Sequence, residues 1–149
     1  MVQNTLQAAL RLVGSTPGYV EVGVALAQLS CDNRIRFDPN LPDRAQTALT
    51  GVITLGPEAA ESSPLSLAQT LVHEHFHLKQ NPLMKTVSFW SGVATKTNVM
   101  KRYEEPAYQA ACDFLEAVKK AHPLLAAEAE DEQAAIRQVF AEGFDGDLA

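Results

Sequence analysis

The chain has 149 residues, of which 46% are hydrophobic and 20% are charged, and its formal net charge is -6. This length and composition predict one globular domain over residues 1–149 and exclude a disordered or fibrous chain. Acidic and basic residues are scattered without a basic stripe, so we expect no nucleic acid partner. No apolar run approaches the roughly 18 residues needed to cross a bilayer, so we expect no membrane partner either.

The N-terminal segment and the cysteines predict a cytoplasmic protein. The first residues, MVQNTLQAALRLVG, lack the basic start and the uninterrupted apolar segment of a signal peptide. The cysteines, Cys31 and Cys112, lie far apart and form no CxxC motif. We therefore interpret both as reduced, buried side chains, which is typical of a cytosolic chain.

The first part of the chain combines helical and strand patterns. The leucine spacing over residues 3–13 predicts a helix that ends near Gly14. The Ser-Thr-Pro sequence at 15–17 can cap a second helix over the segment GYVEVGVALAQL, although the valines there alternate as in a strand. Short strands are predicted at 35–37 and 51–55, and the polar segment between them is expected to be a loop.

A long helix is predicted to begin at a serine cap followed by a proline, Ser63 and Pro64. The helical pattern runs from Leu65 to about Gln80, and an Asn-Pro pair is predicted to end it. This helix contains most of the polar residues on which the functional interpretation depends.

The rest of the chain is predicted to be helical after one irregular segment. Residues 83–101 carry a mixed signal, and Trp90 either lines a pocket or, as we favour, covers the core. A helix is predicted over 103–120, and His122 and Pro123 are predicted to end that helix. An acidic amphipathic helix follows over 124–141. We therefore predict an α+β fold that is mostly helical, with a small sheet.

Three histidines stand at every second position of the segment LVHEHFHLKQ. On a strand, His73, His75 and His77 would face the same way, as a three-histidine metal site requires. On a helix each residue turns by about 100°, so only His73 and His77 align, and His75 points nearly opposite. A segment of about 16 residues between a cap and a stop is too long for a typical strand. We therefore interpret it as a helix, with His75 packed in the apolar arc and the other two facing a cleft.

On a helix, His73-Glu74-x-x-His77 is an HExxH sequence. Two imidazoles one turn apart can reach one tetrahedral zinc ion, and the glutamate after the first histidine points to the open coordination position. There Glu74 can take a proton from the water and later pass it to the leaving amine. The sequence thus predicts zinc as the cofactor, with His73 and His77 as ligands and Glu74 as the general base.

A catalytic zinc ion needs a third protein ligand. The HExxHxxGxxH arrangement is absent, and we interpret His122, at a helix end, as a helix cap or surface residue. A carboxylate on a later helix remains, and Glu104 and Glu105 open the segment EEPAYQAACDFLEA. Either can be the ligand, and the alternative is that both simply stabilise a helix N-terminus.

These motifs resemble those of the gluzincins, the HExxH metallopeptidases whose third zinc ligand is a glutamate on a downstream helix. The short single-domain members, the minigluzincins and the ImmA/IrrE-type proteins, are most similar, and the resemblance covers residues 35–115. In the family the glutamate often begins an E-x-x-A pattern. The resemblance therefore implies Glu104 rather than Glu105 as the ligand, with Ala107 as the small residue that lets two helices approach.

The resemblance also implies a zincin-like fold and zinc-dependent hydrolysis of peptide bonds in a peptide or protein substrate. In the family, the strand before the motif helix, here 51–55, is the edge strand that binds extended substrate. Tyr108, one turn after Glu104, is a candidate catalytic donor to the oxyanion. Pro106 departs from the pattern, because the helix must either begin near Tyr103 or be a longer helix kinked at the proline.

Three other interpretations remain open at this point. The chain can be a related metallohydrolase that acts on a non-peptide amide. It can be a zinc-stabilised regulatory or interaction domain without turnover. It can also be a helical protein without metal, in which the HExxH sequence is a chance occurrence.

Overall fold

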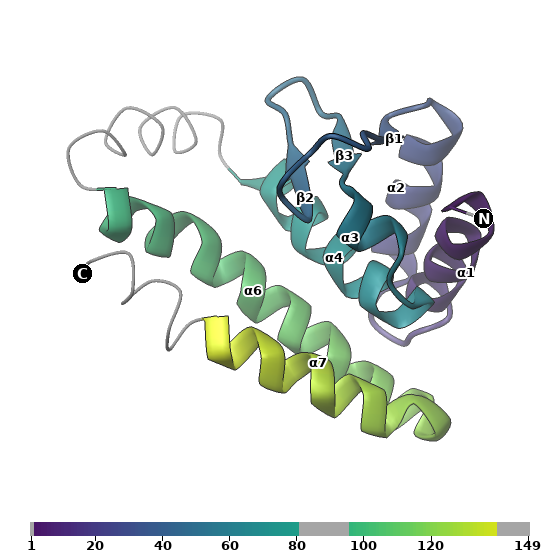
Figure 1. Cartoon of the computed structure of the whole chain (residues 1–149). Helices are drawn as coiled ribbons and strands as arrows, with labels where there is room; N and C mark the ends of the chain where they lie inside the picture. Colours follow the sequence, from purple (N-terminus) through teal and green to yellow (C-terminus); the bar gives the residue numbers. More distant parts are fainter. Residues whose placement is uncertain (1, 81–95, 140–149) are drawn as a thin grey trace.

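The structure is a computed structural model that describes residues 2–80 and 96–139, and helices make up most of it (Figure 1). A three-stranded sheet lies beside the helices, so the predicted α+β, mostly helical fold is confirmed. In chain order the elements are α1 (Val2–Gly14), α2 (Val20–Cys31), β1 (Ile35–Phe37), β2 (Ala45–Thr47), β3 (Ile53–Leu55), α3 (Pro57–Ala60), α4 (Pro64–Lys79), α6 (Lys96–Ala121), the 3-10 helix η1 (Pro123–Leu125) and α7 (Ala126–Gln138).

Helices α1 and α2 are both present, as predicted, and they pack against each other. The valine-rich segment is helical, but α2 begins at Val20 after an N-cap, Tyr19, that makes no side-chain capping bond. The predicted capping role of residues 15–17 is therefore wrong. The Ser15 and Thr16 hydroxyls instead donate to the Leu12 carbonyl, at 3.1 and 2.7 Å, because that carbonyl lies in the last turn of α1 and lacks a helical partner.

The sheet contains one strand that the sequence pattern did not predict. Its order is β1-β3-β2, with β1 parallel and β2 antiparallel to β3. β2 was expected to be loop because the segment is polar and contains prolines, and its three residues acquire strand structure by pairing with β3. The predicted strand at 51–55 exists as β3, but it is the central strand, so its expected role as an edge strand is wrong.

Helix α4 lies between the sheet and the other helices and carries the histidines. The Ser63 hydroxyl accepts a hydrogen bond from the Ser66 amide, and Pro64 occupies the first turn, as predicted. The helix ends at Lys79, with Gln80 as its extended C-cap, and the predicted Asn-Pro stop lies outside the described residues. Three of its leucines are buried in a core shared with α1 and α6, and this packing fixes the orientation of the helix. They are Leu65, Leu67 and Leu71.

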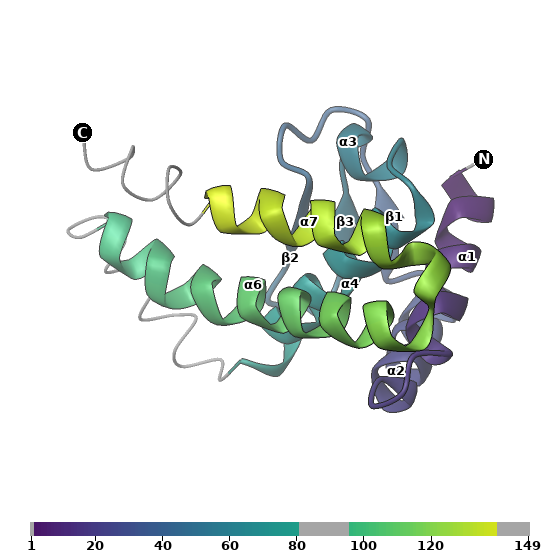
Figure 2. The same ribbon diagram turned by 90° about the horizontal axis from the view of Figure 1, so that it is seen from below.

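Helices α6 and α7 form an antiparallel pair that runs side by side in both views (Figures 1 and 2). α6 begins at Lys96, earlier than the predicted start near Tyr103, and Pro106 lies inside it. The second of the two alternatives for this helix, a longer helix that contains the proline, therefore agrees with its extent. It ends before His122, as predicted, and η1 then leads into α7. Trp90 lies outside the described residues.

The two cysteines are less buried than the sequence predicts. Both cysteines are free, as predicted, but Cys31 is exposed and Cys112 only partly buried, so their expected burial is wrong. Cys31 is the last residue of α2, where the chain turns away from the core towards β1. Within the described residues, no helix is both long and apolar enough to cross a membrane.

Candidate metal centre

Two histidines of α4 converge on one point of the structure. His73 and His77 lie one helical turn apart, their Nε2 atoms are 3.2 Å apart, and their rings meet at 79°. Both side chains are largely buried, with 7% and 2% of their residue surface exposed. His75 is also buried, but it is not among the residues that line the pocket beside the other two, in agreement with the helical phase.

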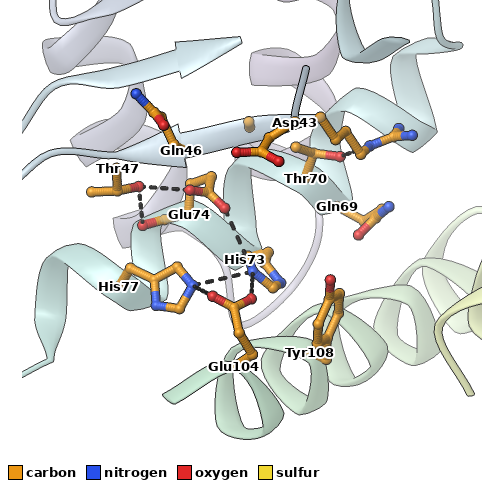
Figure 3. Close-up of a pocket in the computed structure, with 12 residues that line it drawn as sticks. Asp43, Gln46, Thr47, Gln69, Thr70, His73, Glu74, His77, Glu104 and Tyr108 are labelled. Atoms are coloured by element: carbon orange, nitrogen blue, oxygen red, sulfur yellow. Dashed lines mark hydrogen bonds and ion pairs between the residues drawn. The ribbon is translucent and has the colours of Figure 1, made fainter. Parts of the chain in front are cut away.

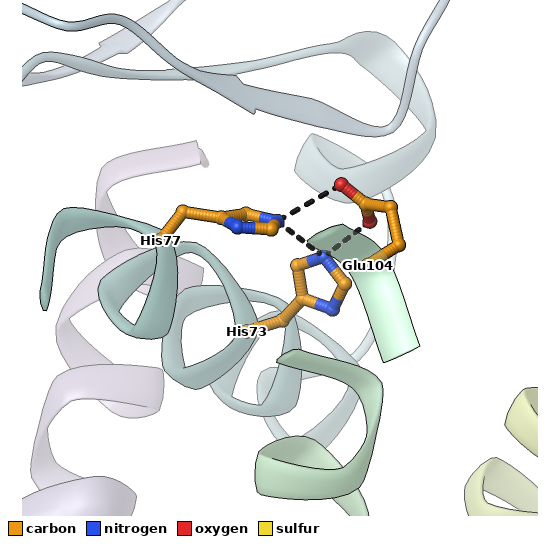
Figure 4. Close-up of side chains that lie close together, drawn as sticks. All are labelled: His73, His77 and Glu104. Atoms are coloured by element: carbon orange, nitrogen blue, oxygen red, sulfur yellow. Dashed lines mark hydrogen bonds and ion pairs between the residues drawn. The ribbon is translucent and has the colours of Figure 1, made fainter. Parts of the chain in front are cut away.

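A glutamate from α6 completes the group. One Glu104 oxygen lies 3.0 Å from His73 Nε2 and the other 3.0 Å from His77 Nε2 (Figure 4). Glu105 is exposed to solvent. Ala107, one turn after Glu104, is fully buried where α6 packs against α4, as expected for a small residue between two close helices. The structure thus brings Glu104, and not Glu105, to the histidines.

The three side chains have donor atoms and a spacing that could hold a metal ion. Imidazole nitrogens and a carboxylate oxygen are the donors found in catalytic zinc sites with three protein ligands. Ligand atoms that are each 2.0–2.1 Å from a tetrahedral ion are about 3.3 Å apart, and the distances here are 3.0–3.2 Å. Within the described residues, these three side chains form a group that could hold a metal ion. The donor set therefore fits a zinc ion.

Gln80 supports this arrangement from outside the group. Its Oε1 accepts a hydrogen bond from His77 Nδ1 at 2.8 Å. A protonated Nδ1 leaves the lone pair of His77 on Nε2, the atom that faces Glu104 and His73. Metal-binding histidines usually donate their second ring nitrogen in this way, which fixes the tautomer and the ring orientation.

The electrostatics of the group favour a charged carboxylate. Burial raises the pKa of Glu104, but the hydrogen bonds and positive charge of His73 and His77 outweigh it, and the pKa falls to about 2. Burial lowers the pKa of His77, but the hydrogen bond and negative charge of Glu104 outweigh that effect, and the pKa is raised. The lowered pKa of Glu104 and the raised pKa of His77 both favour a negative carboxylate beside a positive imidazole.

The cluster lies at the bottom of a pocket of about 390 Å³ (Figure 3). Helix α4 forms its floor, β2 one wall and the part of α6 that carries Glu104 and Tyr108 another. Tyr108 belongs to the α6 wall, where its ring packs edge-on against His73 at a centroid distance of 4.4 Å. Burial and the charges of Glu104 and Glu74 raise the Tyr108 pKa to about 12, although Arg44 opposes them. Its hydroxyl is therefore a protonated donor at neutral pH.

Glu74, the predicted general base, lines the same pocket. Its Oε2 lies 3.5 Å from His73 Nε2, while its Oε1 accepts a hydrogen bond of 2.8 Å from the Thr47 hydroxyl. The residue is only 5% exposed, and burial raises its pKa in spite of the charges of His73 and His77. The Glu74 carboxylate is therefore covered by β2 rather than open to solvent.

Comparisons of the chain with protein-family models, with curated proteins and with solved structures return no match. The geometry of the described residues unites four residues named from the sequence, His73, His77, Glu104 and Glu74, and places Tyr108 beside them. His122 is not part of this group, since its Nε2 lies 3.4 Å from the Thr16 hydroxyl at the other end of α6.

Sequence reasoning missed the residues that β2 contributes. Ala45, Gln46 and Thr47 line the pocket, as does Arg44, which precedes the strand. Arg44 donates to the Thr70 hydroxyl at 2.6 Å and to the Ser66 hydroxyl, both on α4, and pairs with Glu58 at 3.3 Å. These bonds hold the start of β2 against the motif helix. A basic residue next to a short alternating segment, AQT, was the only signal in the sequence, and it is too weak to predict a strand.

Proposed function

We propose that this protein is a zinc-dependent peptidase with a zincin-like, gluzincin-type site. One observation carries the proposal: Glu104 reaches both histidines of the HExxH helix from another helix, beside Glu74 and the outer edge of a β-strand. A chance HExxH sequence gives no reason for a partly buried carboxylate to lie 3.0 Å from both imidazoles. The arrangement therefore favours a metal centre over incidental histidines.

His73, His77 and Glu104 would hold the ion. A zinc ion there would lower the pKa of a water molecule to about 7 and polarise a substrate carbonyl. Three protein ligands leave a coordination position open, which distinguishes a catalytic centre from a closed structural one. The pocket beside the three side chains gives a substrate access to that position.

Glu74 would act as the general base. The oxygen that Thr47 does not engage, Oε2, faces His73 Nε2 and hence the metal position. From there it would take a proton from the attacking water and deliver it to the leaving nitrogen. Burial raises the pKa of this carboxyl, which brings it closer to the operating pH of a general acid–base group.

Tyr108 would stabilise the oxyanion that forms on the substrate. Its hydroxyl points into the pocket in Figure 3, on the opposite wall from β2. A protonated hydroxyl aimed at the place where negative charge develops is a preorganised donor of the kind that lowers the barrier of acyl transfer. We assign it this catalytic role beside that of Glu74.

The outer edge of β2 favours a peptide over other amides. On either side of β2, the Arg44 carbonyl accepts a hydrogen bond from the Gly56 amide and the Ala48 amide donates one to the Val52 carbonyl. These two bonds fix which main-chain groups of the strand face β3 and which face away from it. The main-chain groups of Ala45 and Thr47 therefore point away from β3, towards the pocket that both residues line. An extended peptide can pair with such an edge. β2 takes the role that the resemblance assigned to residues 51–55.

The proposal is tested on protein purified without a histidine tag. Metal per chain is measured by mass spectrometry, and a peptide library is incubated with zinc-loaded wild type and with zinc-loaded Glu74→Gln. We expect one zinc ion per chain and cleavage by the wild type alone. Protein without metal would refute the proposal. Bound zinc without cleavage would favour a zinc-stabilised regulatory domain, and turnover confined to non-peptide amides would favour the related hydrolase.

A further inference from the structure

Thr47 makes a side-chain contact with Glu74 from a different element. Its hydroxyl oxygen lies 2.8 Å from Glu74 Oε1 and 3.3 Å from the main-chain carbonyl oxygen of the same residue. A hydroxyl has a single proton, and the shorter distance directs that proton to the carboxylate. The two residues are 27 positions apart in the chain, so helix geometry does not impose this contact.

The contact gives the two carboxylate oxygens of Glu74 different partners. Oε1 is held by Thr47, whereas Oε2 faces His73 Nε2 at 3.5 Å (Figure 3). A glutamate side chain has three rotatable bonds, and without this hydrogen bond its carboxylate can turn about the last of them. Fixing one oxygen removes that freedom and leaves the other directed at the cluster of histidines and Glu104.

Thr47 is itself held firmly. It lies opposite Ile53, a fully buried residue of β3, and the bond from Ala48 to Val52 continues the pairing on one side. A β-branched side chain has few χ1 rotamers, so a fixed backbone also fixes the direction of its hydroxyl. Arg44 ties the start of the same strand to α4 through the Thr70 hydroxyl at 2.6 Å.

We infer that Thr47 is a positioning residue for the general base Glu74, and that β2 thereby sets the base and the substrate in one register. The inference rests on the proposed function. The side chain of Thr47 orients Glu74, while its main-chain groups belong to the outer edge that would pair with the peptide. A peptide bound to this strand is therefore placed relative to the carboxylate oxygen that takes the proton.

The test compares variants of the full chain loaded with zinc. Thr47→Val keeps the shape of the side chain and removes the donor, and Thr47→Ser restores the donor. Thr54→Val is the matched control, because Thr54 lies on the neighbouring strand β3 and does not line the pocket. For each protein, zinc content, thermal unfolding, kcat and KM are measured, and crystal structures of wild type and Thr47→Val show the position of the Glu74 carboxylate.

Thr47→Val should lower kcat by about 10- to 100-fold, the range that follows from losing a hydrogen bond to a charged group. KM should change by less than about twofold and zinc content should stay at the wild-type value, because the metal ligands and the strand edge are intact. Thr47→Ser should recover most of kcat, and Thr54→Val should match the wild type. In the Thr47→Val crystal structure, Oε2 should leave its position beside His73.

Other results would overturn the inference in distinguishable ways. A zinc-loaded Thr47→Val with wild-type kcat, or with Glu74 unmoved, would show that the hydroxyl does not orient the base. Loss of zinc in this variant would mean that Thr47 supports the metal ligands instead. A wild type without turnover would refute the proposed peptidase but not the contact, and the crystal structures would then decide the role of Thr47 alone.

Discussion

His73 and Glu104 are 31 positions apart in the chain, yet His73 Nε2 lies 3.0 Å from Glu104 Oε2. One residue belongs to α4 and the other to α6, and the fully buried side chains of Ala107 and Ala111 lie along the helix that carries the glutamate. Small side chains let two helix axes approach, which shortens the distance that the carboxylate must span. The packing of these helices therefore assembles the candidate centre.

The three histidines should differ in their effect on metal binding. His73→Ala and His77→Ala should each abolish stoichiometric zinc binding, since both rings face Glu104. His75→Ala should retain zinc but lower the free energy of unfolding by roughly 1–3 kcal/mol, because a buried ring is removed. Metal analysis and urea unfolding check both statements. Equal loss of zinc from all three variants would contradict the assignment.

The two adjacent glutamates should also differ. Glu104→Ala should weaken zinc binding by more than the roughly 10- to 100-fold typical of losing an outer-shell partner, because it removes a direct ligand. Glu105→Ala is the matched control and should bind zinc like the wild type, since Glu105 is exposed. Competition titrations with a chromogenic chelator measure both affinities. The third ligand must lie elsewhere if Glu104→Ala binds zinc normally.

Glu74→Gln should separate catalysis from metal binding. The amide cannot accept the water's proton, so turnover should fall by about 10²- to 10⁴-fold. Zinc content should stay near one per chain. Folding stability should also change little, because the amide oxygen can still accept the Thr47 hydrogen bond and the variant no longer buries a carboxyl group. Full activity of the zinc-loaded variant would eliminate Glu74 as the base.

Gly56 should be intolerant of a side chain. A Cβ atom there would lie 2.2 Å from the Asp43 carbonyl oxygen and 3.0 Å from that of Leu41. Gly56→Ala must therefore displace the main chain that leads into β2, at a cost of about 1–3 kcal/mol in unfolding free energy. Gly14→Ala is the control, because nothing lies within 4 Å of its added Cβ. Urea midpoints of the two variants should differ clearly, and similar midpoints would contradict the close approach of the Asp43 carbonyl to Gly56.

The metal-free protein should be most stable in mildly acidic solution. The folded-state pKa of Glu104, about 2, is below its ordinary value of 4.5, so its contribution is complete above about pH 4.5 and is lost as the pH falls towards 2. The pKa of His77 is raised above 6.5, so its contribution is complete below that pH and is lost as the pH rises through the raised value.

Urea midpoints measured in the presence of a chelator should therefore peak between about pH 4.5 and 6.5. Glu104→Gln should flatten this peak, because it removes the carboxylate on which both shifts depend. Saturating zinc should remove the loss of stability above pH 6.5, since the metal replaces the proton between the ligands. A metal-free protein that is most stable above pH 8 would contradict the ion pair.

Local periodicity determined much of the candidate site from the sequence alone. The helical phase of α4 predicts that His73 and His77 align and that His75 does not. This is possible because the relative directions of the three side chains depend only on residues within a few helical turns. The serine cap and the proline at the helix start were also predictable for this reason. The α+β class followed from the same local patterns.

Only the tertiary structure decided which groups meet at the histidines. The choice of Glu104 over Glu105 depends on the rotation of α6 about its axis, which packing against α4 sets. β2 has only three residues, and its strand structure arises from pairing with β3 rather than from its own sequence. Thr47 and the outer edge of the sheet therefore could not be predicted, because contacts between distant segments carry no local signal in the chain.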